Sequence, residues 1–106
     1  MVNLFDPLPD ASGAEVFTEL LADRGIRIER IVSQGQVTPR DAPYDQPHDE
    51  WVLLLAGGAR LWIEGEGECN LIPGDMVLIP AHIRHSVTWT SAEPPTVWLA
   101  VHLEER

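Results

Sequence analysis

The sequence predicts an all-β fold, a barrel or sandwich of short strands with one short α-helix near its N-terminus. Over most of the chain, apolar and polar residues alternate with the period of two that is typical of strands. Turn-forming pairs such as Gly57-Gly58 and Pro73-Gly74 separate these segments at even intervals, as in β-barrels. A chain of 106 residues can bury one modest core, so we expect a single domain over 1–106, with the helix at 13–22 and the barrel at 26–103.

The predicted helix covers residues 13–22. Asp10 or Ser12 can cap its N-terminus, and Gly25 suits its C-terminal stop. We expect its apolar face to cover one end or one face of the sheets. The apolar residues that recur at the spacing of one helical face are Val16, Phe17, Leu20 and Leu21.

The predicted strands begin at residue 26. The segment 26–32 alternates as a half-buried strand does. The segment 51–56 is apolar on both faces, so it needs cover from a second sheet layer, the helix or another subunit. Gly57-Gly58 then suits a hairpin turn. The remaining predicted strands are 59–64, 67–71, 76–79, 85–90 and 96–103.

The stretch 71–85 joins turn signals to a histidine. Pro73-Gly74 suits the central positions of a type II turn, and Pro80 ends the apolar run before it. His85 then opens a strand on the same face as Val87 and Trp89. A histidine that points the same way as core residues needs a partner, a metal or a ligand.

This stretch resembles the second sequence motif of the cupin superfamily. Gly74, Pro80 and His85 stand at the spacing of that motif, whereas His82 replaces its second Gly and Trp89 replaces its Asn. The resemblance implies a double-stranded β-helix, the cupin jelly-roll barrel, and a homodimer, which is common among small cupins.

The first cupin motif is matched only at its end. Glu50 and Gly57 stand at the spacing of its Glu and Gly. Tyr44 and Gln46 occupy the positions of its two histidines. Cupins often hold a transition metal with three histidines and this glutamate, so the resemblance raises the question of a metal site and also places two poor ligands in it.

Residues 44–50 predict one wall of a pocket. If the segment is extended, its even-numbered side chains point to one side, although Pro47 can break the strand. We expect His85 to face this wall and His102 to be a third contributor from the last strand. The even-numbered polar residues are Tyr44, Gln46, His48 and Glu50.

A divalent metal (Fe, Mn, Ni or Zn) is the first hypothesis for this pocket. Glu50 and His85, completed by His48 or His102, would form a set of two histidines and a carboxylate. Glu50 is also the candidate proton-transfer residue. Against the metal, a Gln carbonyl is a weak ligand and Tyr must lose a proton to bind.

Other roles stay open for several of these residues. His48 lies in a polar, loop-like context, where a solvent-exposed histidine is expected slightly more often than a ligand. His102 is either a pocket residue or a hydrogen-bonded structural histidine. Trp89 shares the predicted face of His85, so it is the tryptophan expected to line the ligand pocket together with Tyr44, Gln46 and His102.

The composition excludes several classes of function. The formal charge is −10, which disfavours nucleic acids and anionic membranes as partners. All seven basic residues are Arg, so chemistry that needs a lysine is absent. No apolar run reaches the roughly 18 residues of a membrane helix, and residues 1–6 do not resemble a signal peptide, so a cytoplasmic location is expected.

Two functions follow as hypotheses. The first is a cupin that binds a divalent metal and a small organic ligand, with dioxygenase, isomerase or lyase chemistry. The second is a metal-free cupin that binds or senses a small molecule without catalysis, which Tyr44 and Gln46 favour because they hydrogen-bond a ligand well and bind metal poorly.

Overall fold

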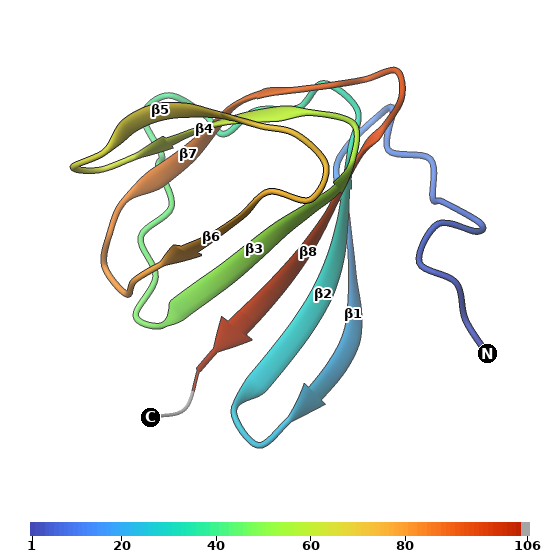
Figure 1. Ribbon diagram of the computed structural model, residues 1–106, viewed down its shortest axis with the longest axis horizontal. Helices are drawn as coiled ribbons and strands as arrows, with labels where there is room; N and C mark the ends of the chain where they lie inside the picture. Colours follow the sequence, from blue (N-terminus) through green and yellow to red (C-terminus); the bar gives the residue numbers. More distant parts are fainter. Residues whose placement is uncertain (105–106) are drawn as a thin grey trace.

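The computed structural model describes residues 1–104 and contains two antiparallel β-sheets that face each other (Figure 1). The larger sheet has the strand order β1-β2-β8-β3-β6, and the smaller sheet has the order β5-β4-β7. The all-β jelly-roll prediction is confirmed. The strands are β1 (Val16–Asp23), β2 (Ile26–Ser33), β3 (Asp49–Ala56), β4 (Ala59–Ile63), β5 (Gly67–Leu71), β6 (Met76–Ile79), β7 (His85–Thr90) and β8 (Thr96–Leu103).

The helix predicted at 13–22 is wrong. This segment enters β1, which pairs antiparallel with β2 along its whole length. The register shifts between Glu19 and Leu21, so the apolar residues on the two sides of this β-bulge no longer alternate with a period of two. Phe17 faces the cavity described below. Over residues 1–104, no helix is long and apolar enough to cross a membrane.

The turns between strands follow the sequence signals. The Asp75 N–H donates to the Ile72 carbonyl at 3.0 Å, and Gly74 has a φ of 97°. This geometry is the turn predicted for Pro73-Gly74. His82, which replaces a motif glycine, has a φ of 63°, so this position takes the left-handed conformation for which glycine is preferred.

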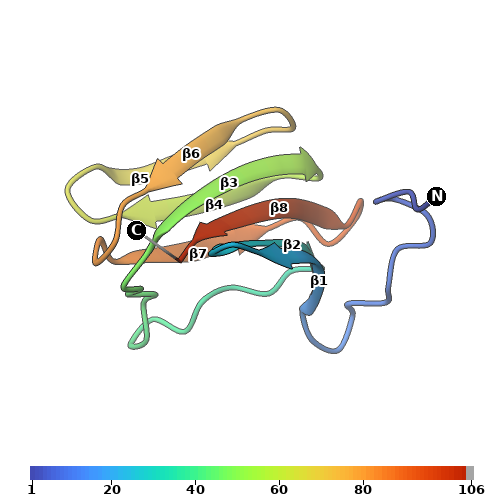
Figure 2. The same cartoon turned by 90° about the horizontal axis from the view of Figure 1, so that it is seen from below.

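The core fills the space between the two sheets, and in Figure 2 the larger sheet lies in front of the smaller one. Leu54 and Ile79 are almost fully buried, and burial of such a side chain stabilises the fold by about 1.5–3 kcal/mol. The buried core residues are Val52, Leu54, Ala59, Leu61, Ile63, Leu71, Ile79 and Trp98.

The outer face of the larger sheet is also apolar. On β3, Trp51 lies opposite Leu78 of β6 and Val101 of β8, and Leu53 lies opposite Met76. Met76 and Leu78 are 64% and 56% exposed. The second face of β3 therefore has apolar neighbours and no layer above it among the described residues.

Candidate functional site

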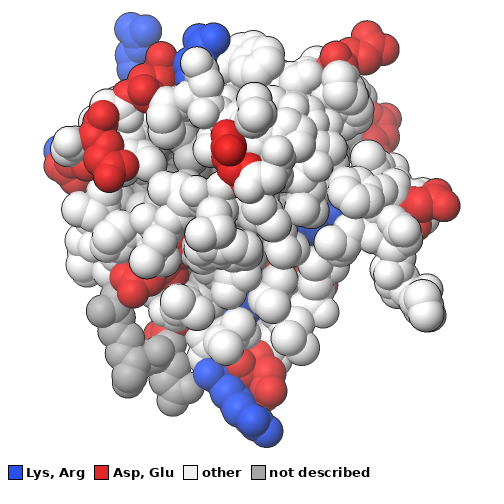
Figure 3. Space-filling model, in the orientation of Figure 1, with Lys and Arg blue, Asp and Glu red and all other residues white. Residues whose placement is uncertain are grey.

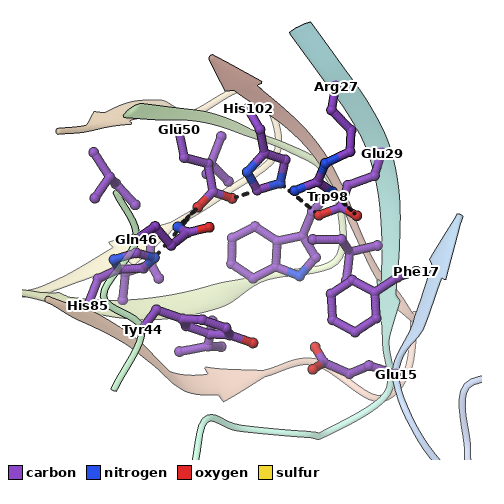
Figure 4. A pocket seen from close by; sticks show the side chains of 15 residues that line it. Glu15, Phe17, Arg27, Glu29, Tyr44, Gln46, Glu50, His85, Trp98 and His102 are labelled. Carbon is purple, nitrogen blue, oxygen red and sulfur yellow. Dashed lines mark hydrogen bonds and ion pairs between the residues drawn. The ribbon is translucent and has the colours of Figure 1, made fainter. Parts of the chain in front are cut away.

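A cavity of about 170 Å³ lies between the two sheets (Figure 4). Its floor shares Val52, Leu61, Ile79 and Trp98 with the core. Its walls are polar. Phe17 and Tyr44 stand at its mouth, where their side chains are 53% and 42% exposed to solvent. The other lining residues are Glu15, Arg27, Glu29, Ile31, Gln46, Glu50, His85, Val87 and His102.

Tyr44 is positioned by the backbone of β7. Its N–H donates to the His85 carbonyl at 2.8 Å, and the His85 N–H donates back to the Tyr44 carbonyl at 3.1 Å. The two rings stack with centroids 5.3 Å apart. This short bridge therefore brings the first-motif position of Tyr44 against the second-motif histidine.

Glu50 and His85 meet at the polar wall. Gln46 Nε2 donates to Glu50 Oε1 at 2.7 Å, and His85 Nε2 lies 3.6 Å from the same oxygen. Glu50 and His85 are both buried, and the His85 Nδ1–H donates to the Ile83 carbonyl at 3.1 Å. Proton uptake at His85 would therefore place an Nε2–H opposite the Glu50 carboxylate.

The pKa values of this pair move in opposite directions. Burial acts to raise the pKa of Glu50, but contacts with His85 and Gln46 outweigh it and hold that pKa below its ordinary value. Burial acts to lower the pKa of His85, whereas its contacts with Glu50 and the Ile83 carbonyl raise that pKa overall. The charged forms of both groups are favoured together.

The Glu50–His85 pair predicts a stability plateau at mildly acidic pH. The stabilisation from Glu50 is complete above its ordinary pKa of 4.5 and is lost as the pH falls through its lower folded value. The stabilisation from His85 is complete below its ordinary pKa of 6.5 and is lost as the pH rises through its higher folded value. Both contributions are present between these two ordinary values.

Urea unfolding from pH 4 to 9 tests this plateau. The wild type should have a larger free energy of unfolding than His85→Gln, and this difference should shrink above the window. A difference that does not change with pH would contradict the proposed role of the Glu50–His85 pair. His82→Gln, which replaces an exposed histidine, is the control.

His48 lies outside the cavity, behind His102. The chain bends at residues 47–48 before β3 begins, which breaks the alternation that would have aimed His48 inward. His48 Nε2 is 2.9 Å from His102 Nδ1, and His102 Nε2 is 2.8 Å from Glu29 Oε1. Since the carboxylate accepts, a neutral His102 carries its proton on Nε2, and His48 donates to its Nδ1.

Trp89 does not line the cavity, contrary to the prediction. The register between β4 and β7 shifts between Arg60 and Leu61, where Val87 pairs with Leu61 and Trp89 pairs with Arg60. This bulge turns the Trp89 ring outward, where it is 45% exposed and lies 5.8 Å from the Arg60 guanidinium.

Several cavity residues were missed from the sequence. The alternation of 26–32 identifies β2 but does not say which face turns inward, and it is the polar face, with Arg27 and Glu29, that lines the cavity. Glu15 and Phe17 fall within the predicted helix 13–22, so the sequence does not place them at the cavity. Trp98 shares a face with His102, which is the one signal that could have placed it.

Comparison with known proteins bears on this cavity. A family model described as the cupin domain matches residues 30–102, well over half of the chain. The chain belongs to the cupin family. A crystal structure of a proposed mannose-6-phosphate isomerase from Ralstonia eutropha JMP134 is 44% identical, with a TM-score of 0.92, and the match covers 99% of this cupin and 98% of that chain.

A more distant solved structure agrees on the fold, and a shorter sequence match covers part of the chain. A cupin superfamily protein from Desulfitobacterium hafniense DCB-2 is 17% identical, with a TM-score of 0.76, over 92% of this chain and 84% of that chain. A 3-hydroxyanthranilate 3,4-dioxygenase from Burkholderia lata is 46% identical over 46 residues, which are 41% of this cupin and 26% of that enzyme. The match therefore covers only about a quarter of the length of such curated relatives.

The donor set of this cupin does not fit the metal that cupins often hold. The expected trio of His48, Glu50 and His85 is not brought together, because His48 lies behind His102. Within residues 1–104, no group of three or more His, Cys, Asp or Glu side chains is arranged to hold a metal ion. The Gln46 amide donates to Glu50, so it opposes a cation at that oxygen.

Tyr44 does not complete a metal site either. Burial raises the pKa of its hydroxyl, and the charges of Glu15, Glu50 and Glu29 raise it further. A phenol must lose its proton to bind a metal well, and this environment holds the proton in place. His102, the alternative third ligand, does lie beside this pair, with its Nε2 3.9 Å from Glu50 Oε2. Both of its ring nitrogens are already hydrogen-bonded, Nε2 to Glu29 and Nδ1 to His48, so only Glu50 and His85 remain as candidate ligands.

Proposed function

We propose that this cupin binds a small organic molecule of about one ring in its barrel cavity and that binding needs no resident transition metal. The observation that carries the proposal is the cavity itself, with an apolar floor and a wall of hydrogen-bonding groups. Sites for small molecules have this composition. The poor fit of the donor set to a metal supports the second half of the proposal.

The cavity volume supports a ligand of this size. A closed apolar cavity of about 150 Å³ holds one benzene molecule, and the cavity here measures about 170 Å³. Trp98 supplies a flat apolar surface, and the rings of Tyr44 and Phe17 stand at the mouth (Figure 4). One ring with a few polar substituents fits this space.

A screen of one-ring compounds by amide NMR tests the proposal. Hits should shift the signals of Glu50, His85 and the Trp98 indole. Val87→Phe, which fills the cavity, should abolish these shifts, whereas Val101→Phe on the outer sheet face should leave them unchanged. Binding that survives Val87→Phe would overturn the proposal.

Proton transfer on such a ligand is a second candidate function, in the isomerase or lyase class. It is favoured by Glu50 and His85, two buried groups of opposite charge 3.6 Å apart on the cavity wall. The Glu50 carboxylate could take a proton from a ligand, and the protonated His85 could stabilise the negative charge that develops on that ligand. A bound ligand that exchanges a carbon-bound proton in D₂O, with loss of exchange in Glu50→Gln, would support it; no exchange with any ligand would refute it.

We also propose that the apolar outer face of the larger sheet pairs with a second copy of the chain. Met76 and Leu78 are exposed there beside Trp51, and exposed apolar surface of this kind marks protein contacts. Sedimentation equilibrium should give twice the mass of the chain. Leu78→Glu should shift the equilibrium to monomer because it buries a charge at the contact. A monomeric wild-type protein at micromolar concentration would contradict the pairing.

A further inference from the structure

Negative charge is concentrated around the cavity. Three of its lining residues are glutamates, and they come from different parts of the chain: Glu15 precedes β1, Glu29 lies on β2 and Glu50 lies on β3. All three glutamates lie close enough to Tyr44 to affect its hydroxyl. Burial of Tyr44 raises the pKa of this hydroxyl, and the charge of each glutamate raises it further. Figure 4 shows the Glu15 carboxylate and the Tyr44 hydroxyl pointing toward one another.

The positive charge beside the cavity is already committed. Arg27 is the one Arg or Lys among the lining residues. Its Nη1 lies 3.2 Å from Glu29 Oε2, and its Nε lies 3.3 Å from Glu104 Oε1. His85 faces Glu50. His102, the other lining histidine, has its Nε2 2.8 Å from Glu29 Oε1 and 3.9 Å from Glu50 Oε2. With His85 protonated and His102 neutral, the three lining carboxylates outnumber the two lining cations by one.

The groups left for a ligand are mostly acceptors. Glu15 Oε2 accepts from the Ser33 hydroxyl at 2.5 Å, and no hydrogen bond within residues 1–104 engages Glu15 Oε1. Gln46 uses its amide N–H on Glu50, and its amide oxygen is directed toward the cavity (Figure 4). The wall therefore offers oxygen lone pairs, with the Tyr44 hydroxyl as an available donor.

We propose that this cavity selects a ring compound that carries an ammonium group and rejects one that carries a carboxylate or a phosphate. The inference deepens the proposed small-molecule function and rests on it. An anion placed here loses hydration and faces like charges, each of which costs binding energy, whereas an ammonium donates to Glu15 and Gln46. The rest of the surface acts in the same direction, since acidic side chains far outnumber basic ones (Figure 3).

This selectivity separates the cupin from two proteins that it resembles. A mannose phosphate and an anthranilate, the molecules in the names of those proteins, each carry an anionic group. Similar folds would then serve ligands of different charge.

Three ring compounds of nearly equal size test the inference: benzylammonium, benzyl alcohol and benzoate. Each is titrated into the full chain at low salt, and the indole signal of Trp98, assigned with Trp98→Phe, reports binding. Benzylammonium should bind at least about tenfold more tightly than benzoate, with benzyl alcohol between them, and added salt should narrow the gap. Benzoate that binds as tightly as benzylammonium, while benzyl alcohol also binds, would overturn the inference and leave the small-molecule function standing. If none of the three shifts the indole, both proposals fall.

A pair of charge-neutralising variants locates the selectivity. Glu15→Gln should lower the benzylammonium-to-benzoate preference at least about threefold. Glu66→Gln removes the same charge from an exposed turn between β4 and β5 and should leave the preference intact. An equal loss in both variants would assign the preference to the net charge of the molecule and overturn selection by the cavity.

Discussion

Replacement of Tyr44 and Gln46 by histidine should give the cavity about one tightly bound transition metal ion per chain. The two positions match the histidines of the first cupin motif, and both side chains already lie beside Glu50 and His85. Tyr44→His with Gln46→His would replace a protonated phenol and an amide donor with two imidazoles. Three histidines and a carboxylate form a ligand set suited to Fe, Mn, Ni or Zn.

The metal content of four purified proteins measures this gain. Elemental analysis after incubation with Zn²⁺, Ni²⁺ or Mn²⁺ should find about one ion per chain in the double variant and well under one in the wild type. Adding His85→Ala to the double variant should abolish binding, because one of the four ligands is lost. The fourth protein, His48→Ala in the wild-type background, should match the wild type. About one metal ion per chain in the wild type would contradict the conclusion that the present side chains do not form a metal site.

The sequence predicts the fold well because its strongest signals are local. Turn geometry at Pro73-Gly74 depends on two residues and their immediate neighbours, and the structure has that turn. The positions of Glu50 and His85 also follow from the spacing of their motifs, which fixes where each strand begins. Both side chains line the cavity as expected.

The errors arise where the alternation of a strand is interrupted. A bulge in β1 gives its apolar residues a helix-like spacing, and a bulge opposite β4 turns Trp89 outward. The bend at residues 47–48 likewise separates His48 from Glu50. Such irregularities are set by pairing with a distant strand, so the sequence of one segment does not reveal them.

The register between strands is the other missing quantity. Glu29 and His102 form a hydrogen bond across 73 positions of sequence, and Arg27 is the direct neighbour of His102 in the sheet. Arg27 and Glu29 are unremarkable in their own segment, and the pattern of the last strand does not say what His102 contacts. Their meeting point depends on how β2 and β8 align, which is decided by the whole sheet.

Gly57→Ala should be among the most destabilising single substitutions in this chain, with a loss of about 3–5 kcal/mol in the free energy of unfolding. Gly57 has a φ of 80°, and an added Cβ would lie 2.7 Å from Thr96 Cα and 2.8 Å from the Pro95 carbonyl oxygen. These are backbone atoms, and Thr96 is fully buried with its hydroxyl bonded to the Gly58 and Ser91 carbonyls. Relief of the clash would therefore have to move the start of β8, which carries Trp98 and His102 to the cavity.

Gly65→Ala separates the clash from the strain in the backbone. Gly65 has a similar φ of 87°, and an added Cβ would meet nothing within 4 Å, so alanine there should cost only the left-handed conformation, about 1–2 kcal/mol. Urea unfolding followed by tryptophan fluorescence compares the two variants. The difference between them measures the contact of Gly57 with β8, because the strain in φ is common to both. A Gly57→Ala protein within about 1 kcal/mol of Gly65→Ala would show that the start of β8 yields easily.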